Sequence, residues 1–457
     1  MKLFKLTALS GFIFIPIIIS CIEYLIWSRY WAESIHNKIK RIPLDIITAE
    51  RIKNYKQILD KAIKLNIPDS KYNYTRAELF LKEGSYSSAR DDYIKAICLE
   101  PTNALYHFKL GEVYLKQSID EIYKNKAIDE FKKTIFLNPT NSYFRFLIGK
   151  NYFYLGMDKE FVLEEFKQSL NLSLLYQDEI MEFVYKNISK EYEDLNYIIP
   201  QNNIEALQRL GIFLDNKNRW EEAKKEFYKI LALEPKDEKY YVIFTQRADA
   251  RKDFAVRLDI WPKFLKFYPA NKTGLSGLIY GYFNLKDYSS ALKICEEALR
   301  LYPDDVAFLL LSGNLYSLLG EYDSAISNFK KVLKLEPLNR QAHIQLVKVY
   351  RDKNDLTSSL YYAEKMYQLF PADIEMTSIY AWILFQKGLY DEANTLWQEC
   401  LRKDPKYYSA LLGLGLSFEH KGDLEKARYY YEKAKAIYPD KEELNTHLER
   451  IKGKQKE

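Results

Sequence analysis

Five histidines and four cysteines are the side chains of this 457-residue chain that are best suited to bind a metal or act as nucleophiles. No two histidines stand at the spacing of a helical metal-binding pair such as HExxH, and each lies in a different part of the chain. Cys98, Cys295 and Cys400 occupy positions of three distant predicted helices where a small apolar residue belongs. We therefore predict that these cysteines fill the core, and we expect no metal, no cofactor and no disulfide.

A stretch that contains Gly274, Gly277 and Gly281 is rich in glycine, as phosphate-binding loops are. It lies within one apolar helical segment between Lys272 and Leu285, and the motif GxxxxGK[ST] is absent from the chain. Close packing of helices explains these glycines better than a phosphate-binding loop. Acidic residues are plentiful, but they lie on solvated helix faces, and we assign no acid or base role to them.

A repeat positions all of these residues. Prolines follow one another at a constant interval of 34 residues, which indicates a stacked array of one small unit. Apolar residues recur at helical spacing on both sides of a Gly or Asn, so each unit is predicted to consist of two helices. The proline cannot continue a helix and stands just after the end of the second one. These prolines are Pro235, Pro269, Pro303, Pro337, Pro371, Pro405 and Pro439.

Three further positions of each unit have a physical reason. A Gly or Asn seventeen residues before the proline is predicted to take the left-handed conformation that ends the first helix. A small residue twelve before the proline lets the two helices approach closely, and an aromatic residue eight before it is expected to fill the gap toward the next unit. The first position holds Gly84, Gly320, Asn354, Gly388 and Gly422; the second holds Ala89, Ala127, Ala223, Ala291, Ala325, Ser359, Ala393 and Ala427; the third holds Tyr93, Phe131, Phe227, Trp261, Phe329, Trp397 and Tyr431.

The pattern resembles the tetratricopeptide repeat, most clearly between Pro303 and Pro337. The positions that carry the resemblance there are Leu311, Gly313, Tyr316, Gly320, Tyr322, Ala325, Phe329 and Pro337. The resemblance implies an all-α fold, a right-handed superhelical solenoid of antiparallel helix pairs with ten units. The predicted segments are a transmembrane anchor or uncleaved signal at 1–28, a basic segment and N-terminal capping helix at 29–69, three units at 70–175, a non-repeat helix and loop at 176–203, seven units at 204–441, and a C-terminal capping helix and tail at 442–457.

Some units depart from the pattern. A short insertion lies near residues 117–124. The third unit ends at Ser173 in place of a proline, and it carries Phe161 where alanine is usual. Residues 176–203 fit no unit, and they are predicted to form either a hinge or a degenerate repeat that continues the stack.

Residues 6–27 form an apolar stretch that, as a helix of roughly 33 Å, would cross a bilayer. Lysines precede the stretch, and Trp27, Tyr30 and Trp31 follow it, as expected at a membrane–water interface. We therefore predict a transmembrane helix and a single-pass protein of the bacterial inner membrane. A lipoprotein processed at Cys21 and a cleaved signal peptide are the alternatives.

Charge gives conflicting evidence on orientation. Residues 29–64 contain nine Lys or Arg and four Asp or Glu, which by the positive-inside rule would hold the array in the cytoplasm. The lysines before the apolar stretch favour an array outside the cytoplasm, and we slightly prefer this orientation. The array itself has almost no net charge and no basic stripe, so nucleic acid is not a predicted partner.

In the family that the repeats resemble, first helices line the concave face of the solenoid, and we expect a partner there. We predict a groove that binds an extended peptide or a partner helix through aromatic and cationic side chains. For each aromatic side chain, the alternative is packing between neighbouring units. The candidate residues are Tyr143, Phe146, Lys150, Phe153, Tyr280, Phe283, Lys348, Arg351, Trp382 and Phe385, and those at 143–153 form the strongest cluster.

These features predict a membrane-anchored scaffold that mediates protein–protein interactions. The array leaves no segment long enough for an ordinary catalytic domain, so we do not expect an enzyme. The alternative function is an accessory protein of the cell envelope, associated with polysaccharide or peptidoglycan, in which concave aromatic side chains stack on a glycan.

Overall fold

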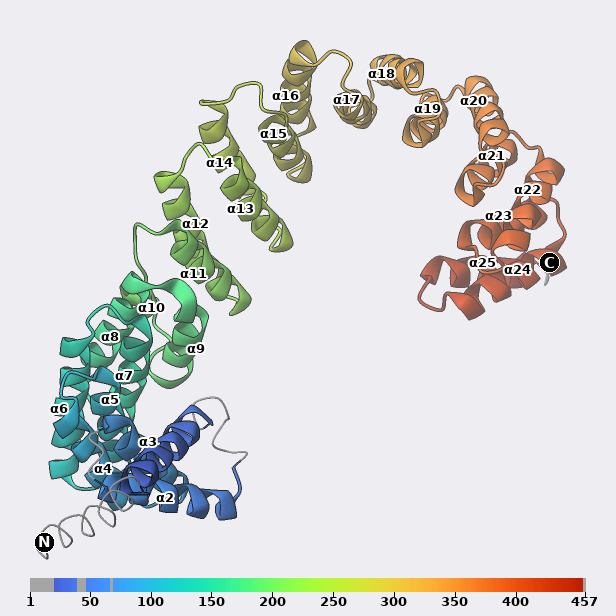
Figure 1. Ribbon diagram of the computed structural model, residues 1–457. Coiled ribbons are helices and arrows are strands. Elements are labelled where there is room, and N and C mark those ends of the chain that lie inside the picture. Colours follow the sequence, from blue (N-terminus) through green and yellow to red (C-terminus); the bar gives the residue numbers. More distant parts are fainter. Residues whose placement is uncertain (1–19, 39–46, 66–68, 455–457) are drawn as a thin grey trace, which may run out of the picture. The chain divides into compact units, whose positions relative to one another are not determined.

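A computed structural model of the chain describes residues 20–38, 47–65 and 69–454 (Figure 1). In these ranges every regular element is a helix and no strand occurs. The chain divides into two compact units, Met1–Leu233 (unit 1) and Glu234–Glu457 (unit 2). After a helix over 20–38, unit 1 contains α2 (Ala49–Lys64), α3 (Ser70–Lys82), α4 (Tyr86–Leu99), α5 (Ala104–Lys116), α6 (Glu121–Leu137), α7 (Ser142–Tyr154), α8 (Lys159–Leu172), the short 3₁₀-helix η2 (Leu174–Tyr176), α9 (Gln177–Asn187), α10 (Tyr192–Ile198), α11 (Ile204–Asn216) and α12 (Trp220–Leu233).

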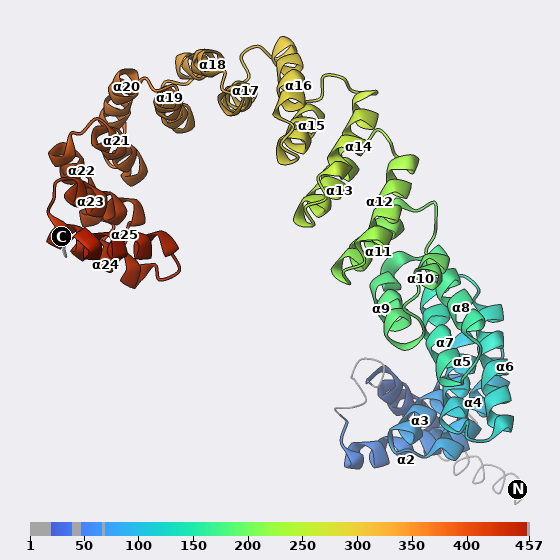
Figure 2. The same cartoon turned by 180° about the vertical axis from the view of Figure 1, so that it is seen from behind.

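Unit 2 consists of six helix pairs and a final helix. In both views the first helices α15, α17, α19 and α21 lie on one side of the second helices α16, α18, α20 and α22 (Figure 1, Figure 2). The helices are α13 (Glu238–Ala250), α14 (Ala255–Leu265), α15 (Lys272–Asn284), α16 (Tyr288–Leu301), α17 (Val306–Leu318), α18 (Tyr322–Leu335), α19 (Arg340–Asp352), α20 (Leu356–Leu369), α21 (Ile374–Gln386), α22 (Tyr390–Lys403), α23 (Tyr408–His420), α24 (Leu424–Ile437) and α25 (Glu442–Lys454).

The turn between the two helices of a pair has the predicted left-handed residue. Gly320 has a φ of 81° and Asn354 a φ of 65°, so the prediction is confirmed at these positions. The same conformation occurs at Lys252 (φ 59°) and Lys286 (φ 63°), where the residue type gives no signal for it. Because a Cβ atom crowds the following carbonyl in this conformation, the two lysines store a small conformational cost that glycine avoids.

The small and aromatic positions form the core of each pair. Ala325 and Phe329 are fully buried, and a Cβ atom on Gly313 would lie only 2.6 Å from the ring of Phe329. The ring therefore fills the gap inside its own repeat, and it also shares a core cluster with Leu346 and Val349 of the next repeat, the side that the sequence predicts. Trp397 likewise reaches the next repeat, where a Cβ on Gly413 would lie 2.4 Å from its indole. Close packing also accounts for the glycines of α15, because a Cβ on Gly277 would lie 2.3 Å from Trp261.

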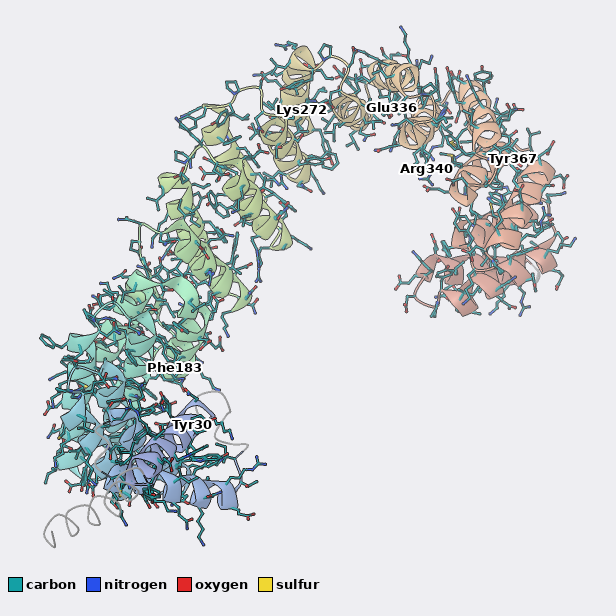
Figure 3. All side chains as sticks on the ribbon, viewed as in Figure 1. Tyr30, Phe183, Lys272, Glu336, Arg340 and Tyr367 are labelled. Carbon is teal, nitrogen blue, oxygen red and sulfur yellow. The ribbon has the colours of Figure 1, made fainter. Side chains whose placement is uncertain are left out.

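Successive repeats are joined by packing and by ion pairs. First helices of neighbouring repeats contact each other, as α17 does with α19 and α19 with α21. Arg340 at the start of α19 (Figure 3) binds Asp373 at 2.8 Å and Glu375 at 2.6 Å in the next repeat. At the end of unit 2, α25 buries Leu444 and Ile451 against α23 and α24, so it covers the last apolar face of the stack.

The prediction of a transmembrane helix and a single-pass membrane protein is wrong for the part of the chain that the structure describes. No helix there is both long and apolar enough to cross a bilayer. Residues 6–19 of the predicted span lie outside the described residues. The remainder belongs to the helix over 20–38, which becomes polar after Trp27 and buries Ala32 and Ile35 in a core shared with α2 and α3.

Candidate binding surface

The strongest predicted cluster lies on α7, where its four members differ in exposure. Tyr143 is 47% exposed, whereas Phe146 is buried with 4% of its surface exposed. Lys150 and Phe153 are half-buried. Phe146 is therefore part of the packing of unit 1, and the other three side chains remain accessible at least in part.

Rings from the segment after α8 lie against this cluster. Tyr176 of η2 stacks on Phe146, with ring centroids 4.9 Å apart and planes within 7° of parallel, and its centroid is 5.6 Å from that of Tyr143. Phe183 of α9 (Figure 3) meets Phe153 edge to face at 5.4 Å. The buried Phe166 of α8 links the two groups, because its ring centroid lies 6.5 Å from that of Phe146 and 5.7 Å from that of Phe183. The rings thus form one continuous aromatic layer, and such pairs hold each other in fixed orientations.

Lys150 lies in the middle of this layer. Its Nζ atom is 5.3 Å from the ring centroid of Phe146 and 5.6 Å from that of Phe183. An ammonium group at these distances is attracted by the negative faces of both rings. We call the accessible part of this layer the α7–α9 surface: it comprises Tyr143, Lys150, Phe153, Tyr154, Tyr176 and Phe183.

In length, the segment 176–203 corresponds to a shortened repeat. From the start of α9 at Gln177 to the start of α11 at Ile204 the chain advances 27 residues (204 − 177), against 34 from Arg340 to Ile374 (374 − 340) in a regular repeat. The loss falls mainly on the second helix, since α10 has 7 residues and α18 has 14.

The shortening explains why Phe183 is accessible. Phe183 is the seventh residue of α9, and the seventh residues of α19 and α23 are Leu346 and Leu414. Both leucines are fully buried, whereas Phe183 is half-buried. The short α10 lies mainly against α8 and covers little of α9, so the side chain at this position remains partly at the surface.

The third unit has a different register from the predicted one. Phe161, placed by the sequence at the small core position, is 55% exposed, and Val162 is buried in its place. The cause is a turn that is one residue longer: α8 begins three residues after Gly156, and α18 begins two residues after Gly320. Sequence spacing measured back from Ser173 could not detect this insertion.

The predicted site residues in unit 2 form no comparable surface. Tyr280 is 44% and Phe283 36% exposed, and Phe283 packs on Tyr288 at 5.7 Å. Arg351 pairs with the adjacent Asp352 at 2.8 Å, and Lys348 is half-buried.

Trp382 and Phe385 pack both within their own repeat and on the next one. Their rings lie 5.1 and 5.9 Å from that of the buried Trp397 on α22 of the same repeat. On α23 of the next repeat, Ser409 accepts a hydrogen bond from Trp382 at 2.7 Å, and the ring of His420 lies 5.3 Å from that of Phe385.

A charged group on α3 and α5 escaped the sequence analysis. Lys109 donates to Glu112 at 2.9 Å, and Glu78 accepts a hydrogen bond from Tyr93. Burial acts to lower the pKa of Lys109, but the carboxylates of Glu78 and Glu112 outweigh it, so the pKa lies above its usual value. The sequence contains a signal for this group, because charged residues recur at one position of successive first helices. Glu78, Glu112 and Lys150 are the ninth residues of α3, α5 and α7.

The histidines and cysteines have structural roles where the structure describes them. The ring of His107 contacts the carbonyl of Pro101 at 3.0 Å and that of His343 the carbonyl of Pro337 at 2.9 Å, at the same position of two repeats. Cys98 is exposed and so does not fill the core as predicted.

The other two cysteines of the array are buried. Burial raises the pKa of Cys295 to about 12 and that of Cys400 to about 11, so neither is a thiolate at neutral pH. Over the described ranges no group of three or more His, Cys, Asp or Glu side chains could hold a metal ion.

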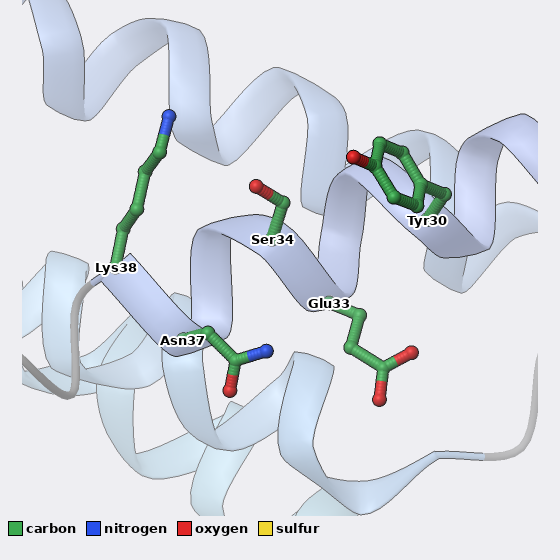
Figure 4. A pocket seen from close by; sticks show the side chains of 5 residues that line it. All are labelled: Tyr30, Glu33, Ser34, Asn37 and Lys38. Atoms are coloured by element: carbon green, nitrogen blue, oxygen red, sulfur yellow. The ribbon is translucent and has the colours of Figure 1, made fainter.

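A cavity of about 500 Å³ adjoins the helix over 20–38 (Figure 4). The described residues that line it belong to that helix: Tyr30, Glu33, Ser34, Asn37 and Lys38. They combine one acid, one base and polar groups.

Comparison with protein families confirms the repeats. Models described as tetratricopeptide repeat match residues 310–374, 381–442 and 278–305, and a model described as TPR repeat matches residues 77–118. These matches fall in both units.

Among curated proteins, anaphase-promoting complex subunit 7 of Homo sapiens is 26% identical over 131 residues, which are 28% of this chain and 23% of that protein. DnaJ homolog subfamily C member 7 of Homo sapiens is 23% identical over 205 residues, which are 42% of each chain. The chain therefore spans less than half the length of these curated relatives.

Solved structures of helical repeat proteins are also similar. A tetratricopeptide repeat protein from Parabacteroides merdae ATCC 43184 is 18% identical with a TM-score of 0.42, covering 55% of this chain and 99% of that one. Yeast Tom70 is 15% identical with a TM-score of 0.39, covering 94% of this chain and 96% of the other.

Proposed function

We propose that this chain, which carries tetratricopeptide repeats, is a non-catalytic scaffold that binds a protein or peptide on the α7–α9 surface. The observation that supports the proposal is the aromatic layer around Lys150, with Tyr143 47% and Tyr154 60% exposed at its edges. Aromatic side chains that are exposed yet already ordered are typical of residues that dominate binding energy in protein interfaces.

The packing of the rings supports binding in a second way. Tyr176 stacks on Phe146 and tilts against Tyr143, and Phe153, Tyr154 and Phe183 meet edge to face at the other end of the surface. Side chains that are held in place before binding lose little conformational entropy when a partner arrives. In unit 2, by contrast, Trp382 and Phe385 have their faces occupied by neighbouring rings of the same unit.

A glycan ligand, the alternative from the sequence, is less well supported. Sugar binding by stacking requires a free aromatic face, but the face of Phe146 is against Tyr176. The rings of Phe153 and Phe183 meet edge to face. A polypeptide, whose apolar side chains insert between ring edges, suits this arrangement better.

The proposal is tested with a phage library of random twelve-residue peptides selected on the full chain. We expect enriched peptides whose binding, measured by fluorescence anisotropy, is lost when Tyr143→Ser and Tyr154→Ser are combined. The matched control is Tyr361→Ser, which removes a tyrosine with 59% exposure on a second helix and should leave binding unchanged. A failure to enrich any peptide, or equal binding by the double variant, would refute the proposed function.

A further inference from the structure

Lysines between two aromatic rings occur at several places in the described residues, and two of them, Lys217 and Lys330, have polar partners for the ammonium group. Lys217 lies 5.0 and 5.2 Å from the rings of Tyr185 and Phe213, and it also pairs with Glu182 at 2.9 Å. Lys330 lies between two tyrosines, which provide hydroxyl groups. At these sites, carboxylate or hydroxyl groups of the chain itself interact with the ammonium group.

Lys150 differs from them. Its two rings are phenylalanines, which offer no hydroxyl group. Among the residues that the structure describes, Lys150 has no hydrogen bond or ion pair, although it is half-buried. An ammonium group in a partly desolvated aromatic setting gains strongly from an anion, because the local dielectric constant is lower than in water.

Several acids of the neighbouring helices are already paired with another cation. On the same helix, Arg145 binds Glu165 at 2.8 Å, and Lys109 on α5 binds Glu112 at 2.9 Å. On the α9 side, Glu182 is held by Lys217. Lys150 is the charged member of the α7–α9 surface as defined above, and it has no ion pair among the described residues.

We propose that Lys150 binds the carboxylate of an Asp or Glu side chain in an internal segment of the partner. This inference rests on the proposed function, since it names the chemistry of the partner at the same surface. Aromatic side chains lie on both sides of the cation along α7, with Tyr143 toward the start of the helix and Phe153 and Tyr154 toward its end. A segment with an acid in the middle and apolar residues on both sides matches this order, whereas a chain terminus has residues on one side only.

The test uses the same display library, in which the C-terminus of every peptide is joined to the coat protein. On the unmodified chain we expect enriched peptides with an Asp or Glu between aromatic or large aliphatic residues. Selection on Lys150→Met should lose the acid and keep the apolar residues, and Lys150→Arg should retain the acid. Lys217→Met is the matched control: it removes a lysine that also lies over two rings but has its own carboxylate, and it should leave the selected motif unchanged.

Affinity measurements then isolate the contact. A synthetic form of the enriched peptide, blocked at both ends, should bind roughly tenfold more weakly when its acid is replaced by the amide. The same replacement should change binding less than about twofold on the Lys150→Met chain, where the ammonium group is missing. Circular dichroism of each variant checks that the helices are intact.

The outcomes separate this inference from the proposed function. Peptides that require Tyr143 and Tyr154 but show no preference for an acid, or the same preference on Lys150→Met, would overturn only the assignment of Lys150. If a peptide whose sole carboxylate is its free C-terminus bound as tightly as the enriched peptide, the assignment of an internal segment of the partner would be wrong. A failure to select any peptide would remove both the inference and the function on which it rests.

Discussion

Trp382 and Phe385 in unit 2, and Phe153 and Phe183 in unit 1, are aromatic side chains of first helices, but their surroundings differ. The first two pack on the buried Trp397 within a repeat of full length. Phe153 and Phe183 meet at the surface, where α10 has only 7 residues. All four side chains are half-buried, so the comparison teaches that the difference lies in what each ring packs on: Trp382 and Phe385 contact a fully buried tryptophan, whereas Phe153 and Phe183 contact each other across α7 and α9.

The largest expected effect belongs to the core of a regular repeat. Replacing the fully buried Phe329 by alanine removes a ring from its contact with Gly313 and should lower the free energy of unfolding by about 3–5 kcal/mol. Urea denaturation followed by circular dichroism measures the loss. Peptide binding to unit 1 should be unchanged in buffer, and a loss below about 1 kcal/mol would contradict the assignment of this ring to the core.

The comparison is sharpened by a smaller change at equivalent positions of the two kinds of repeat. Phe183→Ala should cost only about 1–2 kcal/mol of stability, because the ring is half-buried, but it should weaken peptide binding markedly. Leu346→Ala, at the seventh position of a full repeat, should cost about 2–5 kcal/mol and leave binding unaffected. If both substitutions affected stability and binding alike, the shortened repeat would have no separate role.

A third effect concerns the turns. Lys286→Gly should raise the stability of unit 2 by about 0.5–1 kcal/mol, because glycine adopts a φ of 63° without steric cost. Gly320→Ala should lower the stability of unit 2 by about 1 kcal/mol. A Cβ atom at this position meets no atom within 4 Å, so the loss would come from backbone strain alone. Thermal denaturation compares the two variants, and an unchanged or lower midpoint for Lys286→Gly would contradict the argument.

The repeat made much of the fold predictable. Small residues such as Ala325 and aromatic residues such as Phe329 stand at fixed spacing because close helix packing demands them, and the structure buries both. Lys252 and Lys286 were missed because lysine has no preference for the left-handed conformation; only their alignment with Gly320, at the same 34-residue interval, indicates it.

The candidate surface was predictable only in part. Tyr143, Lys150 and Phe153 could be found because first-helix positions follow from the spacing. Tyr176 and Phe183 could not, since the shortened repeat has lost the residues that define the pattern and its partners are set by tertiary packing. The anchor prediction failed for a related reason: apolar composition near Trp27 does not show that the helix continues to residue 38 and packs on α2 and α3.

The smallest expected effect is a pH dependence confined to the end of unit 2. His447 of α25 stacks on Tyr431 at 5.0 Å and contacts Arg450 at 2.8 Å. Burial lowers the pKa of His447, the charge of Arg450 lowers it further, and Glu419 and Glu443 only partly oppose this. Because the folded state then binds fewer protons than the unfolded state below about pH 6.5, the stability contributed by this contact is present at neutral pH and falls on acidification.

Hydrogen exchange measured at pH 7 and pH 5.5, corrected for the intrinsic effect of pH, should show a loss of protection in α25 and none in α17. His447→Phe keeps a ring against Tyr431 but cannot take up a proton, so the difference between the two pH values should disappear in this variant. An equal loss of protection in the variant would assign the pH dependence to another group. The pH dependence would then give no evidence that the contact between His447 of α25 and Tyr431 holds α25 on the last regular repeat.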